Sequence, residues 1–118
     1  MPYDEVLVNR VKTVLGGGRR VEAKKMFAGL TFMVRGKMCV SVGKDRIMCR
    51  IDPAIHDAAL ERPGCRTVVM KGRPYRGFVH VDAEAVKTDG DLAYWVGLAL
   101  EYNQRAKASA KVRNRKNR

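Results

Sequence analysis

The chain has 118 residues, which is enough for one domain with one modest core. Its apolar fraction of 46% is ordinary for a globular protein, and no apolar run is long enough to cross a membrane. The opening segment MPYDEVLVNRVK carries acids early and no apolar stretch, which argues against a secretory signal. We therefore expect a cytoplasmic protein without a membrane partner.

The net charge of +12 is the least ordinary property of the chain, and it is unevenly distributed. Seven of the 24 basic residues lie in the segment 105–118, which contains no acid. Residues 1–104 hold the other 17 basic residues together with all 12 acidic ones. We expect 1–104 to fold as a domain and 105–118, which has few apolar side chains, to be a disordered basic tail. This asymmetry favours an acidic polymer or surface as a partner.

A first helix is predicted over about 3–15, where apolar residues recur at spacings of three and four. The glycine triplet 16–18 should end this helix, because glycine adopts left-handed conformations without steric cost. A phosphate cradle normally follows a strand and opens a helix, so a triplet that follows a helix does not predict one.

Four short strands are predicted next, over 21–27, 30–35, 38–42 and 46–51, with glycines at the corners. If Lys44-Asp45 is a two-residue loop, Val40 pairs with Cys49, and Cys39 lies on the opposite sheet face. That register disfavours a Cys39–Cys49 disulfide, whereas a three-residue loop would pair the two cysteines directly.

A second helix is predicted over about 53–62, because Asp52-Pro53 is typical of a helix start. His56 lies one position away from the apolar stripe of this helix, so we expect it to be partly exposed. The residues expected to be buried in this stripe are Ile55, Ala58 and Ala59.

A second hairpin is predicted from strands over 65–71 and 77–82, joined by a loop over 72–76. Alternation along the return strand places His80 and Phe78 on one face and Val79 and Val81 on the other. We interpret His80 as a strand residue at a packed edge rather than as a catalyst.

The last helix is predicted from Thr88-x-x-Asp91, which resembles a capping box, to about residue 106. Its inner face should carry Leu92, Trp95, Val96 and Ala99. The fold class is therefore α+β: an antiparallel sheet of five to six strands with helices packed on it, in the order one helix, three or four strands, one helix, two strands and one helix.

Three ordered motifs carry a resemblance to a known family. The segment 24–39, KKMFAGLTFMVRGKMC, resembles the N-terminal domain of the TfoX/Sxy family, which typically shows two basic residues followed by M-F-G-G-x-x-F-M. The segment 72–81, GRPYRGFVHV, is similar to its G-R-P-x-x-G-F/Y-V signature, and 91–96, DLAYWV, to its final-helix pattern. Ala28 departs from the glycine that many members carry.

The resemblance implies an α-β-α-β-α architecture like that of secretion chaperones, and it supplies no catalytic residues. It also implies a regulator of the kind that promotes competence for DNA uptake. Full-length TfoX proteins have a second, helical C-terminal domain, whereas this chain continues only with the basic tail, so we expect a stand-alone N-terminal domain.

Enzymatic function is not indicated by the sequence. No Ser–His–acid or Cys–His spacing, no HExxH and no P-loop motif occurs. Turns and helix starts account for the acids at 82, 84, 89 and 91. Three cysteines without a CxxC pair favour reduced thiols over a metal site, and we expect no cofactor and no metal.

Two binding functions remain. The first is a regulator that contacts nucleic acid non-specifically through phosphates, for which the candidate residues are Lys24, Lys25, Arg35, Lys37, Lys71, Arg73, Arg76, Arg105, Lys107, Lys111, Arg113, Arg115, Lys116 and Arg118. The alternative is a protein-interaction or homodimerising module, whose adaptable surface would include exposed Met38, Met48 and Met70.

Overall fold

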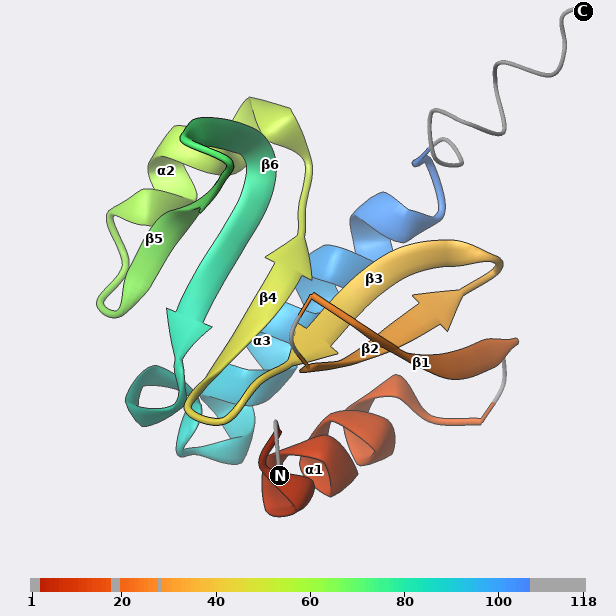
Figure 1. Ribbon diagram of the computed structural model, residues 1–118. Helices are drawn as coiled ribbons and strands as arrows, with labels where there is room; N and C mark the ends of the chain where they lie inside the picture. Colours follow the sequence, from red (N-terminus) through yellow and green to blue (C-terminus); the bar gives the residue numbers. More distant parts are fainter. Residues whose placement is uncertain (1–2, 18–19, 28, 107–118) are drawn as a thin grey trace, which may run out of the picture.

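The computed structural model of the protein describes residues 3–17, 20–27 and 29–106 (Figure 1). Its elements in chain order are α1 (Glu5–Leu15), β1 (Val21–Met26), β2 (Gly29–Val34), β3 (Lys37–Val42), β4 (Arg46–Arg50), η1 (Pro53–Ile55), α2 (His56–Leu60), β5 (Cys65–Met70), β6 (Arg73–Asp82), η2 (Ala83–Val86) and α3 (Asp89–Asn103). This order confirms the predicted α+β class.

The strands form one six-stranded sheet in the order β1-β2-β3-β4-β6-β5, and every neighbouring pair is antiparallel. The chain thus builds a meander through β4, passes through η1 and α2, and adds β5 at the outer edge before β6 fills the gap. Consequently β1 and β5 are the two edge strands.

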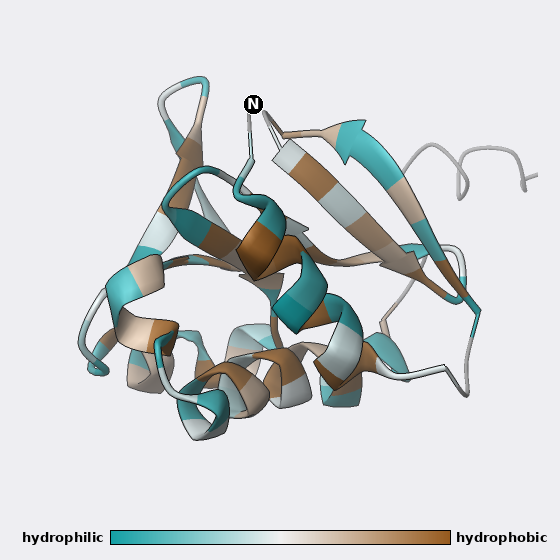
Figure 2. Ribbon diagram, turned by 90° about the horizontal axis from the view of Figure 1, so that it is seen from below, coloured by the Kyte–Doolittle hydropathy of each residue, from teal (hydrophilic) through white to brown (hydrophobic). Residues whose placement is uncertain are grey.

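The helices pack on one face of the sheet. In Figure 1, α3 runs behind β3 and β4, and Figure 2 shows the helices together on one side of the strands. The main core lies between these layers, and its largest fully buried side chains include Trp95, Phe32, Leu15, Ile47 and Ile51.

The other face of the sheet has a second, smaller cluster built only from strand residues. Met38, Met48 and Val68 are buried there, and Met33, Met70 and Phe78 pack against them. We call this side of the sheet, on which Met48 and Phe78 lie, the open face. No helix residue belongs to its cluster among the parts of the chain that the structure describes.

Both long helices form where the sequence predicts them, although α3 ends at Asn103 rather than at about residue 106. Asp4 caps α1 by accepting hydrogen bonds from the backbone N–H groups of Val6 and Leu7, and Gly16 ends the helix at a φ of 72°. The Thr88 side chain accepts from the N–H of Asp91 at 3.0 Å and caps α3. The four residues predicted for the inner face of α3 are all buried.

The predicted register between β3 and β4 is confirmed, but the predicted position of Cys39 is wrong. Val40 pairs with Cys49 as expected. The pairing of β2 with β3 shifts between Phe32 and Met33, which leaves Cys39 as an extra residue in β3. Because a β-bulge breaks the strict alternation of side chains, Cys39 lies in the main core together with Cys49. No disulfide joins these two cysteines.

The second helix differs from the predicted single helix over 53–62. A 3-10 turn precedes α2, and it changes the angular phase of the following residues, so that His56 and Ala59 are buried while Ala58 is exposed. The prediction that His56 is partly exposed is therefore wrong, since its relative exposure is 3%.

The predicted loop over 72–76 is also wrong, because β6 begins at Arg73 and the turn between β5 and β6 is Lys71-Gly72. The register shifts between Thr67, which pairs with Val79, and Val68, which pairs with Tyr75. The extra residues of β6 are thus accommodated around Gly77. This residue has a φ of 92°, a conformation that glycine adopts without steric cost.

Candidate nucleic-acid interface

The predicted phosphate-binding residues do not form one patch. Lys24 and Lys25 lie on β1, whereas Lys71 and Arg73 lie in the β5–β6 hairpin at the other side of the sheet. The two edges of the sheet are separated by five strand spacings, which corresponds to about 24 Å. All four side chains are exposed.

Arg35 and Lys37 are occupied by the end of α3. The Lys37 ammonium donates to the carbonyl oxygens of Asn103 at 2.6 Å and Ala106 at 3.0 Å, and Arg35 donates to the Asn103 side chain at 3.2 Å. Since the last carbonyls of a helix lack intrahelical partners, Lys37 satisfies the carbonyl of Asn103, while Arg35 holds the side chain of the same residue. Their role in the described structure is to hold α3 to the β2–β3 turn.

Arg76 and Arg105 are paired with carboxylates. Arg76 contacts Asp57 at 3.2 Å, and Arg105 contacts Asp52 at 3.1 Å and Glu101 at 2.7 Å. The remaining predicted residues lie outside the described part of the chain: Lys107, Lys111, Arg113, Arg115, Lys116 and Arg118.

The open face has a row of residues that crosses all six strands. Residues directly opposite each other on neighbouring antiparallel strands share a face. The pairing therefore places one residue of each strand in line across the sheet, in the order Lys24, Thr31, Ser41, Met48, His80 and Arg66.

Three cations of the open face were missed by sequence reasoning. Arg46 and Arg50 share the face of Met48 because they are two residues away from it on β4, and Arg66 is opposite His80. Arg73 is opposite Met70, so it also lies on this side. The alternation in RIMCR would have placed both arginines of β4, whereas the prediction concentrated on cations at turns.

Few carboxylates oppose these cations. Among the described strand residues, the register assigns Asp82 and Glu22 to the open face, opposite Arg46 and Met33. Arg66 contacts Asp82 at 2.8 Å, and both side chains are about half exposed. This ion pair lowers the pKa of Asp82, and the carboxylate stays ionised. The open face therefore retains an excess of positive charge.

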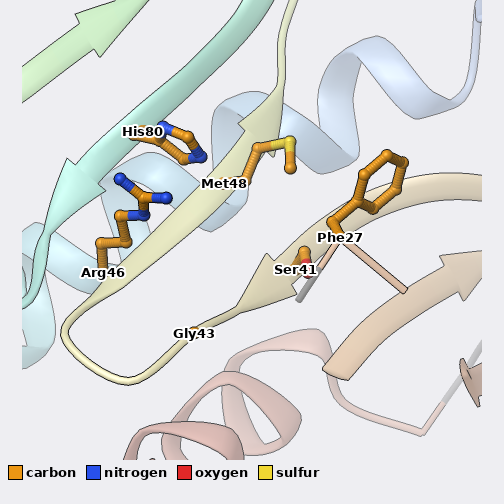
Figure 3. A pocket seen from close by; sticks show the side chains of 6 residues that line it. All are labelled: Phe27, Ser41, Gly43, Arg46, Met48 and His80. Atoms are coloured by element: carbon orange, nitrogen blue, oxygen red, sulfur yellow. The ribbon is translucent and has the colours of Figure 1, made fainter. Parts of the chain in front are cut away.

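A small hollow lies in the middle of the row. Its lining includes Phe27 from the β1–β2 turn, Ser41, Arg46, Met48 and His80 (Figure 3). The Ser41 hydroxyl is buried beside Thr31, with 2.9 Å between their oxygen atoms. A volume of about 20 Å³ accommodates about one water molecule, so the hollow does not hold a metabolite.

His80 is neutral in this setting. Burial, followed by the positive charges of Arg46 and Arg66, lowers the pKa of His80 to about 4, although Asp82 acts in the opposite direction. At neutral pH the ring therefore offers a flat surface and hydrogen-bonding nitrogens without a charge.

A family model for the TfoX N-terminal domain matches residues 13–102. The chain belongs to this family. Comparison with curated proteins and with solved structures gave no match. TfoX N-terminal domains are of a regulatory, competence-associated type, and the match places this chain among them.

The TfoX-like motifs form the turns at the two sides of the open face. Phe27 of the first motif sits at the rim of the hollow, and Gly29 follows it where a Cβ would overlap with the carbonyl oxygen of Val42. Gly72 of the second motif lies in the turn before β6, Arg73 begins that strand, and Phe78 packs in the methionine cluster. The motif residues therefore shape this face of the TfoX domain.

The other titratable groups of the TfoX domain have structural roles. The N–H of Gly77 donates to His56 Nδ1 at 2.8 Å, so the proton is on Nε2 and is donated to Thr67 Oγ1 at 2.9 Å. Burial and the charge of Arg76 lower the pKa of His56. Burial raises the pKa of Cys65 to about 11, which keeps this thiol protonated and unreactive.

No group of three or more metal-ligating side chains is close enough to hold an ion among residues 3–17, 20–27 and 29–106. Within the same described ranges, no helix is long and apolar enough to span a membrane. A second hollow, of about 170 Å³, is lined by Arg62, Glu84, Asp91 and Trp95 beside the start of α3. Arg62 stacks on the Tyr94 ring at 3.8 Å and forms one wall.

Proposed function

We propose that this TfoX-family chain is a non-catalytic, cytoplasmic regulatory module that binds nucleic acid through sequence-independent phosphate contacts. The body contributes the cations of the open face, namely Lys24, Arg46, Arg50, Arg66 and Arg73, and the basic residues that follow Arg105 add further contacts. Positive charge gathered on one face and along one segment is the electrostatic pattern that attracts a polyanion.

One observation carries this proposal: the cations of the open face come from four different strands and yet share one side of the sheet. Lysine and arginine scattered over a surface are ordinary, whereas Lys24, Arg46, Arg66 and Arg73 are exposed together on the side without helices. Arg50 is half-buried and also packs against the Tyr102 ring of α3, at 5.7 Å from its centre. The row from Lys24 to Arg66 crosses all six strands, which gives the face a width suited to an extended polymer.

A non-catalytic role is supported by how the candidate acids and bases are used. Hydrogen bonds on both nitrogens fix His56 inside the fold. His80 is neutral and lies over a hollow too small for a substrate. The carboxylates of Asp52, Asp57 and Asp82 each pair with an arginine.

The proposal predicts a steep dependence of binding on salt. If about six phosphate contacts form, affinity falls roughly a thousandfold between about 50 and 200 mM salt. The measurement is fluorescence anisotropy of a labelled oligonucleotide with the full chain at several salt concentrations. Absence of binding at low salt would refute the proposal.

Two sets of substitutions in the full-length chain separate the contributions of body and tail. Replacing Lys24, Arg46 and Arg66 by glutamine should lower the salt slope by about 0.7–0.9 for each phosphate that is no longer neutralised. Replacing the six basic residues of 107–118 by glutamine should lower it further. Lys12→Gln, on the exposed side of α1, is the matched control and should leave the slope unchanged.

The alternative function is a protein-interaction or homodimerising module without nucleic-acid contact. Its motivating surface is weaker than expected, because Met38 and Met48 are buried at 8% and 5% exposure. A second copy would also bring two positively charged faces together. Recovery of one protein partner in high salt, with no nucleic-acid binding in low salt, would favour this alternative.

A further inference from the structure

Four aromatic rings lie in a track along the open face, one in the β1–β2 turn and three on β6. Phe27 and His80 line the same hollow, with Met48 between them (Figure 3). Phe78 lies two residues before His80 on β6, and this separation corresponds to about 7 Å along the strand. The ring of Tyr75 meets that of Phe78 edge to face, with 6.2 Å between their centroids.

The two ends of this track are accessible. Phe27 is 40% exposed and Tyr75 is 38% exposed, and both belong to the small set of large apolar side chains that the described surface leaves in contact with solvent. Between them, Phe78 and His80 are half-buried and support the track from β6. Exposed aromatic rings on one face of a sheet are surfaces on which unpaired bases stack.

Cations accompany the track along its length. Arg66 is opposite His80, and Arg46 lines the hollow beside it. The guanidinium of Arg50 lies 5.7 Å from the centre of the Phe78 ring. Lys24 and Arg73 lie at the two ends of the face, on β1 and at the start of β6. A groove that binds a single strand combines such rings with charges that follow the backbone.

Phe27 occupies a strained conformation. Its φ of 57° lies in the left-handed region, which is unfavourable for a side chain with a Cβ relative to glycine or asparagine. Glycine or asparagine at this turn would remove the strain, and phenylalanine there gains no burial in the main core. Arg35 and Lys71 adopt the same region in the β2–β3 and β5–β6 turns, so what distinguishes Phe27 is its exposed aromatic ring at such a turn.

We propose, resting on the function proposed above, that the open face binds a single strand of nucleic acid, with unpaired bases stacked on Phe27 and Tyr75 and the phosphates contacted by Arg46, Arg66 and Arg73. The chemistry is shared by single-stranded RNA and DNA. The strand crosses the sheet from the β1–β2 turn toward the β5–β6 turn.

A single strand fits this face better than a duplex does. In a duplex the flat faces of the bases are stacked on one another, so exposed protein rings find no partner and only the cations contribute. The helices of the described residues lie on the other side of the sheet, so none is placed on the open face to enter a major groove (Figure 2). The exposed aromatic rings should therefore make the protein bind a single strand more tightly than a duplex.

The experiment compares labelled oligothymidylate and oligouridylate of about 12 nucleotides with a mixed-sequence duplex of equal length, at about 50 mM salt. The full chain should bind both single strands more tightly than the duplex. Tyr75→Leu and Phe27→Asn should each weaken single-strand binding roughly fivefold or more, because each variant lacks a ring on which a base stacks. Phe27→Asn also suits the left-handed backbone, so this variant remains folded.

The matched control is Tyr94→Leu. Tyr94 has the same exposure as Tyr75, 38%, but lies on α3, on the helix side of the sheet. This variant should bind as the parent chain does. Thermal unfolding of all three variants establishes that each is folded before binding is compared.

Each outcome decides the proposal. The proposal is supported if the preference for single strands disappears in the Tyr75 and Phe27 variants and persists in the Tyr94 variant. Equal binding of oligothymidylate and oligouridylate would show that the face accepts both DNA and RNA. Unequal binding would show which of the two it prefers. Equal or tighter duplex binding, or ring variants without effect while Arg46→Gln and Arg66→Gln weaken binding, would overturn it and leave the phosphate-binding function standing. No binding of any oligonucleotide would refute both.

Discussion

The ammonium of Lys37 donates a hydrogen bond of 2.6 Å to the carbonyl oxygen of Asn103, and this contact joins the β2–β3 turn to the end of α3. The Asn103 side chain completes the connection by donating to the carbonyl oxygen of Val34 at 3.1 Å. A lysine that the sequence suggested for phosphate binding is thus part of the scaffold.

We therefore expect Lys37→Gln to affect stability more than binding. Removal of a charged donor to the carbonyls of Asn103, the last residue of α3, and of Ala106 should lower the free energy of unfolding by about 1–2 kcal/mol, measured by urea denaturation. Lys25→Gln, at an exposed position of β1, is the control and should change stability by less than about 0.5 kcal/mol. Equal effects of the two variants would contradict the assigned role of Lys37.

Stability should fall on mild acidification because of the two histidines. The folded-state pKa values of His56 and His80 are both lowered, the latter to about 4, so the unfolded chain binds protons that the folded chain refuses. Their contribution is fully present above the unfolded pKa of about 6.5 and is lost as pH decreases toward the folded values.

Thermal unfolding between about pH 7.5 and 4.5 tests this expectation, in a range where most carboxylates remain ionised. The loss assigned to His80 should reach about 2 kcal/mol, after allowance for its partial exposure to solvent. His80→Gln should flatten the pH dependence. If this variant kept the full slope, the environment assigned to His80 would be incorrect.

Gly29 should not tolerate a larger residue. A Cβ at this position would overlap with the carbonyl oxygen of Val42, at the close crossing of the β1–β2 turn over β3. Gly29→Ala should lower the free energy of unfolding by about 2–3 kcal/mol, as judged by chemical denaturation. Gly17→Ala is the matched control, since nothing lies within 4 Å of a Cβ there, and it should be nearly neutral.

Asp82 should restrain nucleic-acid binding by neutralising Arg66. Because the two side chains are in contact at 2.8 Å, Asp82→Asn frees one cation of the open face. The salt slope of binding should increase by up to about 0.9, which is the contribution of one further phosphate contact. Asp89→Asn, whose carboxylate contacts Arg10 on the helix side, should leave the slope unchanged. An equal effect of both variants would point to general charge rather than to the open face.

Much of the fold was predictable because local chemistry and periodicity agree. The turn chemistry of Gly36, the capping by Thr88, and the alternation of Val79 and Val81 each indicated the observed element. The two-residue loop at Lys44-Asp45 fixed the register of β3 with β4 correctly.

The errors arose where one residue changes the phase of its neighbours. The bulge at Cys39 and the 3-10 turn before His56 each change the direction in which the following side chains point. Local sequence propensities do not predict either feature. A register shift near Gly77 also allows residues 73–76, which were predicted to form a loop, to belong to β6.

The candidate site was predicted only in part, because neighbours in space were inferred from neighbours in sequence. The predicted phosphate-binding residues were chosen because cations cluster at the turns, yet Arg35 and Lys37 form hydrogen bonds with Asn103 at the end of α3. Arg46 and Arg66 reach the same face from strands far apart in the chain, and only the strand order β4-β6-β5 brings them together. Strand order depends on tertiary packing and is not encoded in local spacing.

The most direct test of the central claim is a titration of the isotopically labelled full chain with oligothymidylate of about 12 nucleotides at about 50 mM salt, followed by amide chemical shifts. The open face should respond, with shifts concentrated at Lys24, Arg46, Arg66 and His80 and near their strand neighbours. Shifts confined to α1 and α3, or no shifts at all, would contradict the assignment of this face as the nucleic-acid interface.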